Sequence, residues 1–91
     1  MAFDWNGLTL GSALVSRNIR LDDHRTSIRL EPAMWDALSE IAALEGETVH
    51  GLCAKVDDMR GELGRTAAIR VFIVSYYRAR ARGTARRAPK G

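Results

Sequence analysis

The stretch Arg25-Thr26-Ser27-Ile28-Arg29-Leu30, followed at once by Glu31-Pro32, decides how this chain folds. In an extended conformation successive side chains point to opposite faces, so Arg25, Ser27 and Arg29 share a basic, polar face and the alternate residues share an apolar one. Proline cannot donate to a strand ladder, and its fixed φ suits the first turn of a helix. The sequence therefore predicts a short strand that runs directly into a helix.

This strand needs a partner, because an isolated strand of such length is not stable in water. One possible partner is residues 18–21 of the same chain, joined to it by a turn at Asp22-Asp23, whose side chains can bond their own backbone. The other is the same strand of a second chain, antiparallel across a two-fold axis. The second pairing gives a two-stranded ribbon of a shape that the major groove of duplex DNA admits.

Three helices are predicted after the strand. Apolar residues recur with helical spacing over 32–45, Gly46 is expected to end that helix, and Thr48 to cap the next one. A third helix opens at Arg65 or Thr66 and runs to about Arg80. The residues predicted to be buried in the first two helices are Met34, Trp35, Leu38, Ile41 and Ala42, then Val49, Leu52, Cys53, Val56 and Met59 or Arg60.

The third predicted helix is apolar on most of its circumference. A helix of this kind is normally buried on more than one side. A chain of 91 residues is only marginally stable alone, so this pattern indicates contact with a second subunit.

The run R-T-S-I-R-L-E-P-A-M-W-D-A-L-S-E-I-A at residues 25–42 resembles the ribbon-helix-helix DNA-binding proteins. It is most similar to a bacterial branch in which a strand of the type R-x-x-R-T-S-x-R-L-E precedes a W-D-A-L helix, and the resemblance extends over residues 17–79. It implies a mostly α fold, with a short N-terminal strand that pairs in an intertwined homodimer and three helices after it, whereas the simplest members have two. It also implies paired strands in the major groove and a second helix that offers its N-terminus to a phosphate.

The resemblance and the exposed strand face together predict the site. The predicted base contacts are Arg25, Ser27 and Arg29, because arginine bonds guanine O6 and N7 in bidentate fashion and serine can bond several bases. Because Gly64-Arg65-Thr66 also looks like the start of a second helix in this family, Thr66 is an alternative to Thr48 as the phosphate-facing start. The residues predicted to contact DNA phosphates are Arg17, Thr48, Val49 and Arg82.

The charge is distributed unevenly along the chain. The net charge is +3, but residues 78–91 hold six basic groups and no acidic one, so the rest of the chain is slightly acidic. We expect an N-terminal arm at 1–16, a ribbon-helix-helix domain at 17–80 and a basic disordered tail at 81–91. Such a tail can bind phosphates without sequence preference.

Catalytic and metal chemistry are not indicated. The single cysteine, Cys53, excludes an internal disulfide and a cysteine-based zinc site. His50 can share a helix face with it, but Cys53 lies on the apolar stripe, where cysteine behaves as a small hydrophobe. We expect no enzymatic activity, no cofactor, no metal and no small-molecule substrate. The sequence shows no membrane span and no basic leader, so a cytoplasmic location is expected.

The leading hypothesis is therefore a homodimeric, sequence-specific transcriptional regulator that binds double-stranded DNA. The chief alternative is a helical homodimeric protein-interaction module, antitoxin-like proteins included, in which the strand only joins subunits and its arginines face solvent. A third hypothesis is a non-specific architectural protein that acts through its basic tail.

Overall fold

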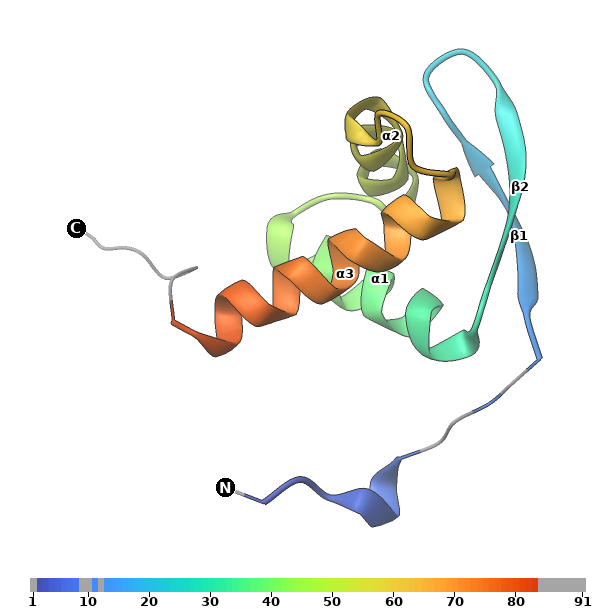
Figure 1. Cartoon of the computed structure of the whole chain (residues 1–91). Helices are drawn as coiled ribbons and strands as arrows, with labels where there is room; N and C mark the ends of the chain where they lie inside the picture. Colours follow the sequence, from blue (N-terminus) through green and yellow to red (C-terminus); the bar gives the residue numbers. More distant parts are fainter. Residues whose placement is uncertain (1, 9–10, 12, 84–91) are drawn as a thin grey trace.

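The computed structural model describes residues 2–8, 11 and 13–83. After a single 3-10 turn at Trp5–Gly7 come two strands, β1 (Val15–Arg20) and β2 (Arg25–Leu30), and three helices, α1 (Pro32–Glu45), α2 (Val49–Met59) and α3 (Arg65–Ala81). The strands form one side of the molecule and the helices pack behind them (Figure 1). The fold is mostly helical with a two-stranded antiparallel sheet, as the sequence predicts.

The two strands form a hairpin within one chain. β1 pairs antiparallel with β2, and the Leu21 N–H donates to the carbonyl oxygen of His24 at 2.8 Å, which closes the turn over the two aspartates at its tip. Of the two partners considered for the predicted strand, this chain thus uses its own preceding segment.

The helix boundaries follow the local sequence signals. Pro32 begins α1, and Gly46 ends it in the left-handed conformation at φ 66°, with its N–H directed to the carbonyl oxygens of Ala42 and Ala43. The Thr48 hydroxyl accepts a hydrogen bond from the Gly51 N–H at 2.9 Å and so caps α2. These three predictions are confirmed.

The core lies between the inner face of the hairpin and the helices. Leu30, Leu38 and Ile41 are fully buried, and the Trp35 indole N–H donates to the carbonyl oxygen of Val15 at 2.9 Å, tying α1 to the start of β1. Most of the predicted stripe residues are buried. Met59 is not: its side chain is 83% exposed, because it is the last residue of α2 and the stripe leaves the core there.

Gly46 offers a test of this helix end. We expect Gly46→Ala to lower the free energy of unfolding by about 1–2 kcal/mol, the usual cost of a left-handed conformation for a residue with a Cβ. A Cβ built at this position meets no atom within 4 Å, so steric overlap does not add to that cost. Urea unfolding measures the change. Gly46→Asn is the control and should cost less, because asparagine tolerates this conformation; an equal loss in both variants would contradict the explanation.

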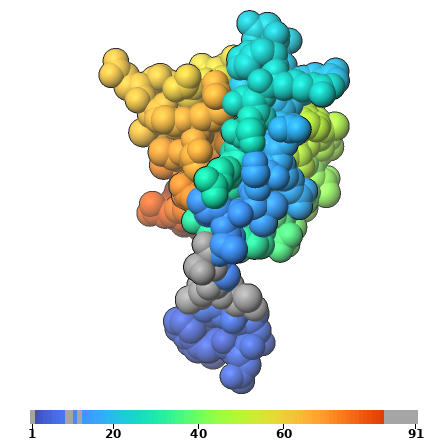
Figure 2. Space-filling model, turned by 90° about the vertical axis from the view of Figure 1, so that its right-hand side faces the viewer, coloured from blue at the N-terminus to red at the C-terminus, as the bar shows by residue number. Residues whose placement is uncertain are grey.

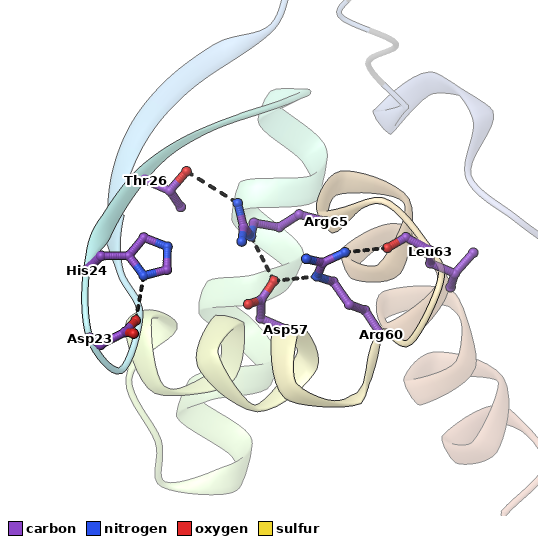
Figure 3. A network of polar contacts seen from close by, with 7 residues as sticks. All are labelled: Asp23, His24, Thr26, Asp57, Arg60, Leu63 and Arg65. Atoms are coloured by element: carbon purple, nitrogen blue, oxygen red, sulfur yellow. Dashed lines mark hydrogen bonds and ion pairs between the residues drawn. The ribbon is translucent and has the colours of Figure 1, made fainter.

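A polar network joins the hairpin to α2 and α3. Asp57 Oδ1 accepts hydrogen bonds from Nε of Arg60 at 2.9 Å and Nε of Arg65 at 2.7 Å, and Nη1 of Arg65 lies 3.5 Å from the hydroxyl of Thr26 on β2 (Figure 3). The adjacent acidic residues Asp57-Asp58 by themselves indicate a solvated turn of helix, but Asp57 is bound by two arginines. Its i, i+3 spacing to Arg60 is a signal that could have indicated a partner.

The same network predicts a pH dependence of stability. The hydrogen bond from Arg65, with the nearby Arg60 charge, lowers the pKa of Asp57 below its ordinary value of 3.8. Because the folded-state pKa is the lower one, this stabilisation is fully present above the ordinary pKa and is lost as the pH falls through the folded value. We expect Asp57→Asn to lower stability at pH 7 by about 2 kcal/mol and to flatten the acid limb of urea midpoints measured from pH 5.5 to 2.5. The exposed neighbour Asp58→Asn is the control, and an unchanged acid limb in Asp57→Asn would contradict the assignment.

Candidate nucleic-acid interface

The outer face of the hairpin carries a continuous set of polar side chains. Strand alternation directs three residues of each strand away from the core, and all six are exposed. Figure 2, viewed from the hairpin side, shows both strands running over the front of the molecule. No acidic residue belongs to the set, and the three arginines make it basic. The six residues, called the outer face below, are Ser16, Asn18, Arg20, Arg25, Ser27 and Arg29.

The residues of the outer face lie opposite one another in three pairs: Ser16 with Arg29, Asn18 with Ser27, and Arg20 with Arg25. The hydrogen bond that closes the turn makes the next pair, Arg20 and Arg25, a non-hydrogen-bonded one, and in this type of pair the side chains are closest. The two serine hydroxyls, of Ser16 and Ser27, lie 2.6 Å apart and are hydrogen-bonded. The outer face is thus a ribbon of closely spaced donors.

The three residues predicted to contact bases, Arg25, Ser27 and Arg29, all lie on this face. The contributions of β1 were missed by the sequence reasoning. Its alternation of polar and apolar residues is interrupted by Arg17, which lies on the inner side of the sheet with its guanidinium 5.2 Å from the Trp35 ring centroid. A phosphate contact by Arg17, as predicted, requires its side chain to leave that ring.

The start of α2 adjoins β1. The outward backbone N–H of Arg20 donates to Nδ1 of His50 at 3.0 Å, and His50 is the second residue of the helix. Thr48 and Val49, predicted phosphate contacts, are therefore beside the hairpin. The Glu47 carboxylate already accepts from the Thr48 N–H at 3.1 Å and pairs with Nζ of Lys55 at 2.9 Å, and the lysine is the main cause of the lowered pKa of Glu47.

The start of α3 adjoins β2 through Arg65 and Thr26. Gly64 caps this helix without a side-chain hydrogen bond, and no acidic residue lies in its first turn. Both helix starts considered in the sequence analysis thus flank the hairpin, α2 next to β1 and α3 next to β2. Only the N-terminus of α2 has backbone N–H groups that are capped by neighbouring side chains, those of Thr48 and Glu47.

Arg82, the fourth predicted phosphate contact, caps the C-terminus of α3. Figure 1 shows that α3 begins beside the hairpin and ends on the far side of the molecule. Arg82 is therefore remote from the outer face of its own chain. Of the predicted tail, only Ala81 to Gly83 are described and they complete α3; residues 84–91 lie outside the described residues.

Cys53 and His50 do not share a site. Cys53 is buried in the core, and burial raises the pKa of its thiol to about 11, whereas His50 faces β1. Within residues 2–8, 11 and 13–83, no group of three or more His, Cys, Asp or Glu side chains is placed to hold a metal ion. No helix in the same part of the chain is long and apolar enough to span a membrane.

Comparison with known protein families gives one match. The model of the ribbon-helix-helix domain family matches residues 14–77, well over half of the chain, so this protein belongs to the ribbon-helix-helix domain family. Members are in general DNA-binding transcriptional regulators or antitoxins, and the fold is a regulatory DNA-binding fold rather than an enzymatic one. No significant match was found among curated proteins or among solved structures.

Proposed function

We propose that this protein is a sequence-specific transcriptional regulator that binds DNA as a dimer, with the hairpin of each chain in the major groove. The observation that carries the proposal is the outer face: three arginines, two serines and an asparagine on a two-stranded ribbon, with no carboxylate among them. The major groove is wide enough to admit a two-stranded ribbon. In this chain one subunit supplies both strands.

Base reading is assigned to Ser27 and Arg29 in the middle and at the open end of the ribbon, together with Arg25 near its tip. Each good bidentate contact of arginine with guanine discriminates by about 1–3 kcal/mol. The Ser27 hydroxyl keeps spare bonding capacity beside its bond to Ser16. Arg25 differs from Arg29 in facing another arginine across the hairpin.

The phosphate contacts flank this ribbon. Thr48 and Val49 at the start of α2 are assigned phosphate contacts because they lie beside β1. The Thr48 N–H is bonded to the Glu47 carboxylate in this structure, so a phosphate at this helix start has to displace Glu47. Thr66 at the start of α3 is the corresponding residue beside β2. Arg17 and Arg82 are assigned phosphate contacts outside the outer face, by virtue of charge alone.

The second subunit is assigned to the exposed side of α3. This surface is favoured because apolar side chains are exposed where α3 meets the end of α2. Met59, Leu63, Val71 and the half-buried Phe72 border a groove of about 250 Å³, and Val74 lies next to it in a second hollow that Val71 also lines. We call this surface the α3 patch; its residues are Met59, Leu63, Val71, Phe72 and Val74.

The α3 patch also supports the second candidate function, a protein-interaction module related to antitoxins, because a partner protein can cover it instead of a second copy. A mobility shift with random duplex DNA across a salt series separates the two. The regulator binds at low salt, and selection from a random pool recovers a preferred site with two-fold symmetry. Absence of binding at low salt would favour the interaction module.

A further inference from the structure

A pocket of about 420 Å³ lies beside the hairpin where β1 meets the start of α2. It is lined by three residues of the outer face, Asn18, Arg20 and Arg25, and by His50 from α2. All four side chains are polar and none is acidic. The pocket is therefore open to an anion rather than to an apolar group.

The two arginines of the pocket repel each other. Arg20 and Arg25 are directly opposite in a close cross-strand pair, a geometry in which like charges destabilise a sheet. Elsewhere Arg60 and Arg65 are neutralised by Asp57, and Arg70 by Glu31. In the part of the chain that the structure describes, neither arginine of the pocket has an ion-pair partner of this kind. An anion bound between them would offset the repulsion.

His50 adds a hydrogen-bond donor to the pocket, the N–H at Nε2. Its Nδ1 accepts the hydrogen bond from the Arg20 N–H, so in the neutral ring the proton is carried by Nε2. The amide of Asn18 and the two guanidinium groups add further N–H donors. Of the acidic groups of adjoining segments, Asp23 is bonded to His24 at 2.6 Å and Glu47 to Lys55 at 2.9 Å, and Asp22 at the tip of the turn does not line the pocket.

We propose that this pocket binds a phosphate group, and that in the DNA complex it holds one backbone phosphate next to the bases read by the same hairpin. Guanidinium groups match phosphate oxygens in bidentate geometry, and a cluster of N–H donors favours an anion with several acceptors. The inference rests on the proposed function and deepens it. It also changes one assignment of the proposed function: Arg25, given a base contact there, holds the backbone phosphate together with Arg20, whereas Ser27 and Arg29 keep the base preference.

The first test measures duplex binding across a salt series for Arg20→Ala and Arg25→Ala. Each variant should reduce the slope of log K against log salt by about one unit and weaken binding to all sequences by a similar factor. Arg80→Ala removes the same charge from α3 and should leave slope and preference unchanged. Thermal unfolding checks that the variants fold, and Arg20→Ala should melt no lower than the wild type because a repulsion is removed. An unchanged slope, or an altered base preference, would overturn the assignment.

The second test uses inorganic phosphate without DNA, followed by chemical shifts of backbone amides in NMR spectra. In the wild type, the amide signals of Arg20 and His50 should shift and saturate, and in the double variant Arg20→Ala/Arg25→Ala they should not. No saturable shift would overturn the phosphate site. If phosphate shifts these amide signals but the variants leave the salt dependence of DNA binding unchanged, the pocket binds free phosphate and the contact with the DNA backbone is overturned. Failure of the wild type to bind any DNA removes the proposed function, but the phosphate titration still decides for or against the pocket.

Discussion

Replacing Arg29 by alanine should flatten the base preference of the protein while leaving it folded. Arg29 is exposed at the open end of the outer face, opposite Ser16 and without an ion-pair partner in the described chain. Loss of a bidentate contact to guanine costs about 1–3 kcal/mol of discrimination, or roughly 5- to 150-fold for each half-site. Competition between the preferred duplex and duplexes with single base changes measures the loss.

Two controls separate base reading from general attraction to DNA. Arg29→Lys keeps the charge but not the planar fork, so it should retain the salt dependence and still lose most of the preference. Truncation after Arg82 removes basic residues of the C-terminal segment and should weaken binding to all sequences alike. If Arg29→Ala and the truncation gave the same uniform loss, the hairpin would not be the part that reads bases.

The helices could be predicted from the sequence because their ends depend on local chemistry. Pro32, Gly46 and Thr48 each act through the backbone of their own turn, and the structure places each of them in the predicted role. The apolar stripes of α1 and α2 also depend only on spacing along the chain. The family follows from the same stretch of strand and helix, and the match over residues 14–77 confirms it.

The pairing of the strands could not be predicted in the same way. A partner within the chain and a partner in a second chain satisfy the same alternation in residues 25–30, so the choice depends on tertiary contacts. The bond of the Trp35 indole to the Val15 carbonyl and that of the Arg20 N–H to His50 hold β1 in place, and both join residues far apart in sequence. For this reason half of the outer face and the pocket lined by Asn18, Arg20, Arg25 and His50 were missed.

The ion-pair partners of Asp57 could not be predicted from the sequence for the same reason. Its neighbours in sequence indicate an exposed helix face, but Arg65 lies beyond a loop and reaches back to the carboxylate. Only the packing of α3 against α2 brings the two groups together. The charged face of a single helix can thus be predicted from the sequence, whereas ion pairs between different helices cannot.

The apolar exterior of α3 leads to the prediction with the largest expected effect. Val71 and Val74 are each about half exposed although their helix is packed on its other side through Ile69 and Ile73. If a second copy covers the α3 patch across a two-fold axis, each substitution acts twice in one interface. Full burial of a valine side chain contributes about 1.5 kcal/mol or more, and about half of this is still to be gained by a half-exposed valine, so four of them contribute about 3 kcal/mol or more.

The double variant Val71→Asp/Val74→Asp should therefore be a folded monomer at concentrations where the wild type is a dimer, with association weakened by at least roughly 10²-fold. Sedimentation velocity over a concentration series measures the mass. Affinity for duplex DNA should fall in the monomeric variant, because one hairpin then binds without the other. Leu44→Asp is the matched control, since Leu44 is as exposed as Val71, at 53%, but lies on α1 away from the α3 patch. If the double variant keeps the mass of the wild-type dimer, the second subunit binds elsewhere. If the wild type is a monomer and selects a single asymmetric DNA site, one hairpin is sufficient for sequence-specific binding.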